Sequence, residues 1–375
     1  MNKKQKEIVK KVIFSFLNIF KNKYIVSNVH QVPNRTEILE NAELSINHHQ
    51  TEYLKHQKLF PYSKSNIKKT NTVDVLYYKN VYVDLDNGIA LNNNLEIIQE
   101  SKKYTSMKVS TYLENISCYK VIEDDCVVVI NGALNAQYFH IWFDSLIKLY
   151  YLNQIKGLKP TIVLWNKIPK IYKEVIYAFN DIFDILEVSE RFIKVKEYAI
   201  IKNLFWAKHA PYITPKIRDF FVQKLVHERH VNKIFQSKIY IARKTRPILN
   251  SAEIENILKI NGYHKVYLED LTIFEQAKLF NTVSVVCGLH GAGFANLIFA
   301  SDCLKVVEFQ NYAVVPTYYF ISQQLNLSYN YLLPNEFNYD DICDPYSESK
   351  KYYNQKLINV SFNLEKIDNL IKQIE

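Results

Sequence analysis

Three of the seven glycines of this chain fall within one short segment, Gly288-Leu289-His290-Gly291-Ala292-Gly293, which we call the glycine turn. An apolar run at 283–287 precedes it, and a second apolar run at 294–300 follows it. The first run indicates a buried strand and the second a short helix. Glycine lets a backbone approach a ligand closely, and a helix that begins after such a turn points free N–H groups at an anion. The pattern predicts a phosphate-binding turn.

Two polar side chains accompany the glycine turn. His290 lies in its middle, where an imidazole beside a bound diphosphate donates hydrogen bonds and, when protonated, adds positive charge. Asn296 follows in the predicted helix and is expected to hydrogen-bond a hydroxyl or base of the same ligand. The segment lacks the Gly-Lys-Ser/Thr ending of a P-loop, and its spacing differs from the dinucleotide fingerprint. A tight strand-to-helix turn with a buried histidine is the structural alternative.

A histidine and an aspartate four residues apart form a second candidate site. On a helix predicted at about 139–153, His140 and Asp144 share a face, and the carboxylate is expected to orient the imidazole. Such a pair suits a general base that deprotonates an alcohol. Lys148 extends the same face and would neutralise an anion. An ordinary surface ion pair is the alternative.

A basic loop follows another apolar run. Residues 239–242 predict a strand, Arg243 and Arg246 come next, and Asn250 or Ser251 is expected to cap the following helix. Ligands of open α/β sheets bind beyond the carboxyl ends of the strands. Guanidinium groups at such an end grip phosphates through paired hydrogen bonds. The two arginines are therefore predicted to bind phosphate, with a basic surface loop as the alternative.

These segments belong to an alternation of strands and helices. Apolar runs predict strands at 73–78, 81–85, 126–130, 161–165, 183–188, 238–243, 264–268, 283–287 and 304–309. This order favours an α/β fold with parallel sheets covered on both faces. At 375 residues the chain is long enough for two domains, and a long helix at 214–232 is the expected connection.

Composition narrows the class of partner and cofactor. Lys and Arg total 47 against 38 acidic residues, a net charge of +9 that suits a nucleotide donor, an acidic glycan or an anionic membrane. The charge is not gathered in one basic, aromatic-rich stripe, which argues against nucleic acid. The five cysteines form no CxxC pair, so we expect free thiols in a reducing cytoplasm rather than zinc or disulfides. Short acidic pairs occur in turn-like sequences and indicate no metal site.

The N-terminal segment has a basic amphipathic pattern. Lysines between positions 3 and 23 accompany an apolar stripe at helical spacing, which suits a helix on an anionic membrane. A helix that packs on its own domain is the alternative. No run reaches the ~20 apolar residues of a spanning helix, and no signal-peptide pattern is evident. We expect a cytoplasmic protein, peripheral on the inner face of the plasma membrane. Residues 24–70 are polar and predicted to be irregular.

The segment from Ile239 to Gln310 resembles the catalytic core of glycosyltransferase family 61. The shared features are the strand ending in Arg243, the basic loop to Arg246, Asn250, Phe274-Glu275-Gln276, Leu279-Phe280, the glycine turn with the residues to Phe299, and Val306-Val307-Glu308. Upstream, His140-x-x-x-Asp144-x-x-x-Lys148 is similar to the family's His-Trp-x-x-Asp-x-x-x-Arg segment. Here the tryptophan comes one place later, at Trp142, and lysine replaces the arginine.

The resemblance implies two facing Rossmann-like domains, a GT-B-like arrangement, and an inverting, metal-independent transfer of a sugar. The expected parts are an extension at 1–70, an acceptor-side α/β domain at 71–232, and a nucleotide-sugar-binding α/β domain at 233–375 that closes with a C-terminal helix. The residues expected to face the donor are Arg243, Arg246, Gly288, His290, Gly291, Gly293, Asn296 and Glu308. His140 and Asp144 would lie across the cleft as the catalytic pair, with Lys148 on the acceptor side.

The resulting hypothesis is a bacterial glycosyltransferase that uses a nucleotide-sugar, expected to be a UDP-sugar, and neither cofactor nor metal. Its acceptor would be a glycan or lipid-linked glycan of capsule or lipopolysaccharide. Two alternatives stay open. One is another polysaccharide-modifying transfer, such as pyruvyl transfer, and the other is a non-catalytic glycan- or membrane-binding protein.

Overall fold

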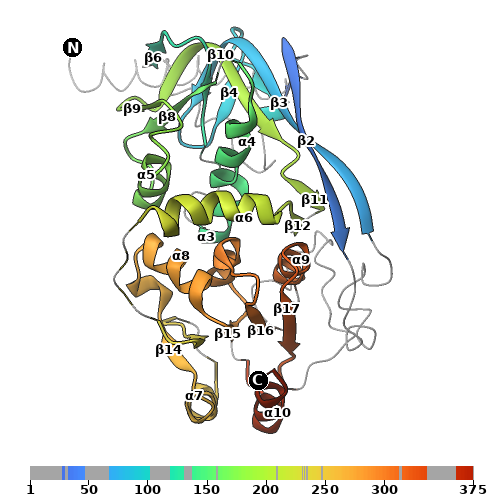
Figure 1. Ribbon diagram of the computed structural model, residues 1–375. Helices are drawn as coiled ribbons and strands as arrows, with labels where there is room; N and C mark the ends of the chain where they lie inside the picture. The colour runs from blue at the N-terminus through green and yellow to red at the C-terminus, as the bar shows by residue number, and fades with distance from the viewer. Residues whose placement is uncertain are drawn as a thin grey trace, which may run out of the picture. The chain divides into compact units, whose positions relative to one another are not determined.

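The computed structural model describes residues 28–29, 33–46, 67–101, 119–130, 137–157, 159–207, 210–229, 231, 233, 235–245, 248–311, 315–335 and 360–374. The chain divides into two compact units (Figure 1). Unit 1 comprises Met1–Leu39, Val73–Ala136 and Asp144–Lys202, and unit 2 comprises Glu40–Thr72, Gln137–Phe143 and Asn203–Glu375. The amphipathic segment predicted at 3–23 lies outside the described residues. Among those that are described, no helix is long and apolar enough to cross a membrane.

Among the described residues, a mixed sheet of ten strands lies mostly in unit 1, while residues 40–46 of β2 and 67–72 of β3 are grouped with unit 2. Its order is β1-β5-β4-β3-β10-β7-β8-β9, with β2 paired to β3 and β6 paired to β10. The strands are β1 (Asn28–Val29), β2 (Arg35–Ile46), β3 (Ile67–Asp84), β4 (Ile89–Leu91), β5 (Ile97–Ile98), β6 (Tyr119–Ile122), β7 (Val127–Val128), β8 (Thr161–Trp165), β9 (Ile185–Val188) and β10 (Phe192–Lys202). The helical elements are η2 (Gln99–Ser101), the π-helix η3 (Ile141–Leu146), which begins in unit 2, α4 (Lys148–Gln154) and α5 (Lys170–Tyr177).

This half of the chain differs from the sequence prediction in three ways. The two strands predicted at 73–78 and 81–85 belong to one strand, β3, which ends at Asp84. The stretch predicted to be irregular contains β2 and the start of β3. The parallel order predicted here holds from β10 through β7 and β8 to β9, whereas β3 runs antiparallel to both β10 and β4. The turn between Asp84 and Ile89 is too short for the crossover that parallel strands require, so β3 and β4 form a hairpin.

Unit 2 contains a parallel sheet of five strands in the order β14-β13-β15-β16-β17. The strands are β13 (Lys238–Ile241), β14 (His264–Val266), β15 (Val285–Leu289), β16 (Lys305–Phe309) and β17 (Ser328–Leu332), and a separate small hairpin joins β11 (Phe205–Ala207) to β12 (Ala210–Pro211). The helices are α3 (Tyr138–His140), α6 (Pro215–Val222), η4 (Gln223–His227), α7 (Ser251–Ile260), η5 (Leu268–Asp270), α8 (Ile273–Thr282), η6 (Ala292–Phe299), α9 (Thr317–Gln324) and α10 (Leu364–Ile374). Numbered in chain order and read across the sheet, the strands follow the doubly wound order 2-1-3-4-5. The carboxyl ends of β13 and β15 therefore form the switch point, where this class of fold binds ligands.

The parallel α/β prediction for the second half is confirmed. The strands predicted at 238–243, 264–268, 283–287 and 304–309 appear as β13, β14, β15 and β16. The helix predicted at 214–232 appears as α6 and η4 within unit 2, so the division of the chain falls after Lys202 rather than after residue 232. The reason is that α6 packs against η6 and its Arg218 pairs with Asp302.

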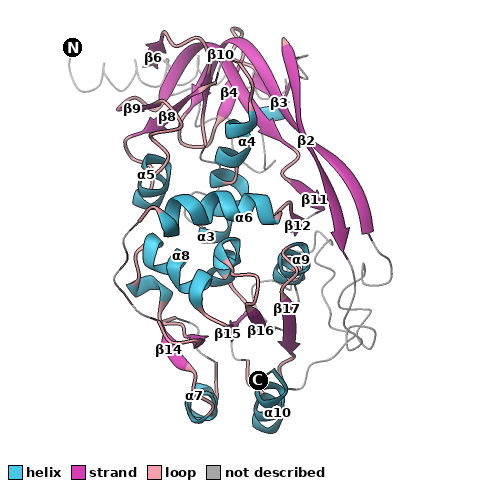
Figure 2. Ribbon diagram, viewed as in Figure 1, coloured by secondary structure: helices cyan, strands magenta, loops and turns pink. Residues whose placement is uncertain are grey.

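Helices cover both faces of the unit 2 sheet (Figure 2). Residues of α7 and α10 share a core with Cys287 of β15 and Val307 of β16, whereas α8 and η6 pack against each other on the opposite face. All five residues of β15 are buried, as expected for a parallel strand covered on two sides. Asn250 precedes α7 as predicted, but its side chain bonds both backbone groups of Phe362 instead of capping the helix.

Candidate functional site

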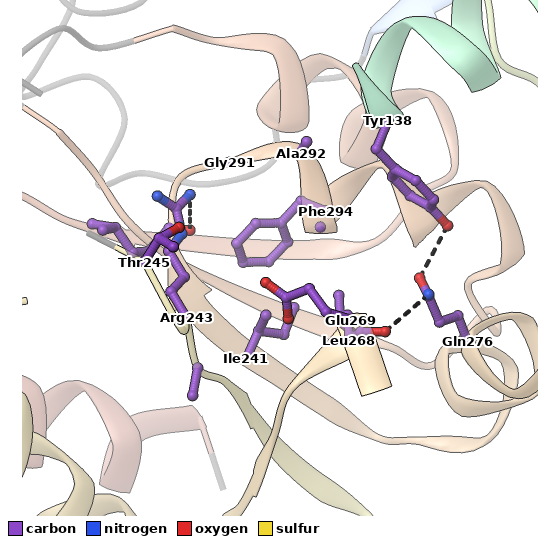
Figure 3. A pocket seen from close by; sticks show the side chains of 13 residues that line it. Tyr138, Ile241, Arg243, Thr245, Leu268, Glu269, Gln276, Gly291, Ala292 and Phe294 are labelled. Carbon is purple, nitrogen blue, oxygen red and sulfur yellow. Dashed lines mark hydrogen bonds between the residues drawn. The ribbon is translucent and has the colours of Figure 1, made fainter. Parts of the chain in front are cut away.

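A pocket of about 380 Å³ lies at the switch point of the unit 2 sheet (Figure 3). Its walls come from the carboxyl ends of β13 and β15 and from η5, α8 and the start of η6. The polar side chains that line it are Tyr138, Arg243, Thr245, Glu269 and Gln276. Strand order and cavity thus agree on the same ligand-binding position.

The guanidinium of Arg243 lies directly over Gly291. It donates to the carbonyl oxygens of His290 and Leu289, the latter at 3.4 Å. A Cβ added at Gly291 would lie 1.7 Å from Nη2 of Arg243, so a side chain at this position would displace the guanidinium. The φ of Gly291 is 168°, extended backbone that any residue adopts, and the glycine is therefore required by the arginine. Arg243 and the glycine turn, which were each predicted to bind phosphate, are in direct contact.

The other two glycines of the turn meet different neighbours. A Cβ at Gly288 would lie 3.1 Å from both the Cβ and the carbonyl oxygen of Ile241 in β13. A Cβ at Gly293 would lie 2.9 Å from Cδ1 of Leu268 in η5. The sequence analysis predicted that the glycines let the backbone approach a ligand closely. In the structure, the space that a Cβ would need is taken by atoms of the protein itself. The glycines let the turn close against β13 and η5, which shapes the pocket wall.

The imidazole of His290 is hydrogen-bonded to a buried carboxylate. Its Nδ1 lies 2.5 Å from Oε1 of Glu308, which is fully buried in β16. The other oxygen, Oε2, accepts from the hydroxyl of Tyr329, and that hydroxyl accepts from Gln310 at 3.0 Å. Glu308 was predicted to face the donor. The structure corrects this: both carboxylate oxygens bind protein groups, so Glu308 orients the imidazole.

A short row of aromatic rings connects His290 with the helix that carries His140. The ring centroid of Tyr318 lies 5.4 Å from that of His290 and 6.2 Å from that of Phe139, which itself lies 5.3 Å from the ring of His140. Burial raises the pKa of the Tyr318 phenol well above its ordinary value, and the charge of Glu308 adds to this effect while Arg243 opposes it. Tyr318 therefore keeps its proton at neutral pH and serves as a packing spacer between the two histidines.

Asn296 occupies the centre of a buried amide network. Its Oδ1 accepts from the Tyr138 hydroxyl at 2.6 Å, and its Nδ2 donates to Gln276 Oε1 and to the Gly293 carbonyl, each at 3.0 Å. Gln276 in turn donates to the carbonyl of Leu268 at 3.0 Å. Asn296 has no exposed surface, so the prediction that it faces the donor is wrong. It fixes Tyr138 and Gln276, which line the pocket in its place.

Sequence reasoning did not assign Tyr138, Gln276 or Tyr329 to the site. Gln276 ends the segment Phe274-Glu275-Gln276 that resembles the family, and this resemblance was the available signal. Tyr138 precedes His140 by two residues, but its partners Gln276 and Asn296 are more than a hundred residues away. No pattern in the sequence around Tyr138 indicates these contacts.

The remaining predicted residues are placed as follows. His140 is half-buried in α3 of unit 2, and α3 packs against η6. Asp144 is buried in unit 1, within a π-helix whose turn is wider than that of the predicted α-helix. Lys148 donates to the carbonyl of Ile130 at 3.0 Å, a contact within unit 1. Arg246 lies outside the described residues. In the part of the chain that the structure describes, no cluster of three His, Cys, Asp or Glu residues is arranged to hold a metal ion.

Comparison with known families identifies one that part of the chain matches. Residues 138–307 match the model of the Glycosyltransferase 61 family. This glycosyltransferase 61 region contains α3, the glycine turn and most of the residues that line the pocket. The match supports the family that the sequence motifs resemble.

Two of the matched proteins illustrate this similarity. The EGF domain-specific O-linked N-acetylglucosamine transferase of Pan troglodytes is 24% identical over 244 residues, which cover 56% of this chain and 45% of the relative. The match thus spans less than half of that protein's length. The bacterial iron-containing dodecameric glycosyltransferase TibC from enterotoxigenic E. coli H10407 is 9% identical, with 81% of this chain and 93% of that chain covered and a TM-score of 0.31. That score is too low to establish a common fold.

Proposed function

We propose that this chain is a glycosyltransferase that moves a sugar from a nucleoside-diphosphate sugar to a hydroxyl of a glycan. The observation that carries the proposal is the switch-point pocket, which has Arg243 in its lining and the start of η6 in its wall. A guanidinium and the N-terminal end of a helix both attract phosphate oxygens. The match to the Glycosyltransferase 61 family supports sugar transfer as the reaction.

The proposed reaction inverts the anomeric carbon. The acceptor hydroxyl gives its proton to a base and attacks from the face opposite the diphosphate, and the bond from the sugar to the diphosphate breaks as the new bond forms. Arg243 and the N–H groups at the start of η6 would stabilise the negative charge that develops on the diphosphate. Because positive and dipolar groups can take this role, we propose that transfer needs no metal ion. The GT-B-like arrangement of two domains stays a prediction.

We propose His140 as the base, oriented by Asp144. His140→Ala is expected to lower the turnover rate by roughly 10²- to 10⁴-fold and to leave the Kd of the donor nucleotide unchanged, because the imidazole would act on the acceptor. Initial-rate kinetics and calorimetric titration with the nucleotide measure the two quantities. The matched control is His264→Ala, which removes an exposed histidine of β14. A His140→Ala protein with wild-type turnover would assign the base to another group.

The donor, the acceptor and the location are also proposals. We propose a UDP-sugar as donor and a surface glycan, such as capsule or lipopolysaccharide, as acceptor, with the protein on the cytoplasmic face of the membrane. The net charge of +9 and the lysines among residues 3–23 suit an anionic membrane that carries lipid-linked glycans. The curated relative is named for transfer of N-acetylglucosamine, so this sugar is the first to test.

A thermal-shift panel tests the proposal. We expect one of UDP, GDP, CDP or ADP to raise the stability of the protein by about 2.7 kcal/mol at a hundredfold excess over its Kd, because only the folded state binds it. Stabilisation by phosphoenolpyruvate and by none of the nucleotides would favour pyruvyl transfer instead. Stabilisation by neither would favour a non-catalytic protein. In an assay of sugar transfer from the nucleotide-sugar that the panel selects, EDTA should leave the rate unchanged. A strict metal requirement would contradict the metal-free mechanism.

A further inference from the structure

A carboxylate of the pocket has no part in the mechanism above. Glu269 lies in η5, directly after β14, the strand that neighbours β13 in the sheet. It lines the pocket, and its side chain extends into the space between Arg243 and Phe294 (Figure 3). The pocket therefore has a guanidinium on one wall and a carboxylate on another.

The next residue shows a different environment. Asp270 forms an ion pair with Lys244, and neither side chain is among those that line the pocket. Among the described residues, no hydrogen bond or ion pair engages the exposed carboxylate of Glu269. The carboxylate of Asp270 thus has a protein partner, whereas the carboxylate of Glu269 faces the cavity and can bind a ligand.

The two charges of the pocket select different parts of a ligand. A diphosphate is attracted by Arg243 and by the start of η6, but it is repelled by a carboxylate. Glu269 must therefore face a part of the ligand that donates hydrogen bonds. A vicinal diol suits it best, because an ionised carboxylate has two acceptor oxygens and can bind both hydroxyls at once. In a nucleoside diphosphate, the ribose carries such a diol next to the diphosphate.

We propose that Glu269 binds the ribose 2′,3′-diol of the nucleoside diphosphate in this pocket. The inference rests on the proposed function and adds how the nucleoside is recognised. The chemistry has a precedent, because an acidic residue accepts a hydrogen bond from a ribose hydroxyl in dinucleotide-binding folds. Phosphoenolpyruvate has no diol, so the same carboxylate would disfavour it.

The proposal is tested by combining the substitution Glu269→Ala with removal of the ribose hydroxyls from the nucleotide. Calorimetric titrations measure the Kd of UDP, 2′-deoxy-UDP and 2′,3′-dideoxy-UDP, or of the matching GDP, CDP or ADP analogues if the thermal-shift panel selects another base. For the wild-type protein, loss of both hydroxyls is expected to weaken binding by roughly 10- to 100-fold, the usual effect of losing hydrogen bonds to a charged group. For Glu269→Ala, the three ligands are expected to bind within about threefold of one another.

Asp270→Ala is the matched control, since it removes a neighbouring carboxylate of η5 that does not line the pocket. It should keep the wild-type preference for the diol. Because Glu269 is exposed, Glu269→Ala should fold as the wild-type protein does, which thermal unfolding verifies. UDP binding without any preference for the diol overturns the inference and leaves the proposed function standing. The same holds if Glu269→Ala keeps the full preference. If no nucleoside diphosphate binds the wild-type protein, the proposed function fails, and the inference fails with it.

Discussion

Arg243→Ala is expected to lower the rate of sugar transfer by roughly 10²- to 10³-fold, the usual effect of removing one charge-stabilising donor from an active site. The guanidinium lines the pocket and is positioned by the carbonyl oxygens of the glycine turn. No other arginine among the described residues lines this pocket. The fold should survive, because the side chain is only half-buried and packs over a backbone rather than inside a core. Initial rates together with thermal unfolding measure the two effects separately.

Gly291→Ala should reproduce this loss without removing the arginine. The new methyl group would occupy the place of Nη2, and the flexible end of Arg243 would move aside at little cost in stability. Gly293→Ala is the matched control, because its Cβ would meet Leu268 instead of Arg243. We expect it to retain most of the activity. If Gly291→Ala transfers sugar at the wild-type rate, the observed position of the guanidinium is not the one that matters for catalysis.

Glu308→Gln is expected to reduce the transfer rate by roughly 100-fold while the protein stays folded. The buried carboxylate accepts at both oxygens, from Tyr329 and, in this assignment, from Nδ1–H of His290. An amide has only one acceptor oxygen, so one of these donors would meet an NH₂ group. The analogous exchange in the serine-protease triad leaves the geometry intact and costs about 10⁴-fold through the wrong histidine tautomer. A smaller effect is expected here because His290 is predicted to bind the ligand rather than to act as a general base.

The tautomer itself is the decisive measurement for this substitution. Nitrogen-15 NMR of the imidazole should show the proton on Nδ1 in the wild-type protein and a shift toward Nε2 in Glu308→Gln. Tyr329→Phe, which removes one donor but keeps the carboxylate, should leave the tautomer unchanged and lower the rate less than tenfold. An unchanged tautomer in Glu308→Gln, with an unchanged rate, would mean that Glu308 is only a buried structural group.

The second half of the chain was the more predictable one. Strands such as β15 are buried on both faces, so their sequences are continuous apolar runs that stand out from the helices around them. Arg243 and the glycine turn follow two of these strands, and the rule that ligands bind at the carboxyl ends of strands placed both at the site. The position of the pocket could be predicted from these local features, whereas the packing of Arg243 over Gly291 could not.

The roles that sequence did not reveal depend on distant partners. An acidic residue at the end of β16 has the same local pattern whether it faces a ligand or a histidine. Only the packing of β15, β16 and β17 brings His290 and Tyr329 to Glu308. In unit 1, β3 pairs antiparallel with β10, more than a hundred residues away, and alternating apolar residues fit either direction of pairing. Register between distant strands is not encoded in any one segment.

The three glycines of the turn carry different information about relatives of this protein. Gly288 is constrained by the backbone of β13 and Gly293 by Leu268, so both positions report how the sheet and η5 pack. The three heavy atoms nearest to a Cβ at Gly291 all belong to Arg243. Across homologues, positions 243 and 291 should therefore vary together, while 288 and 293 stay fixed. A relative without the arginine could replace the glycine at position 291. Glycines kept at 288 and 293 in such a relative would indicate that the fold is preserved, and would not indicate that the activity is.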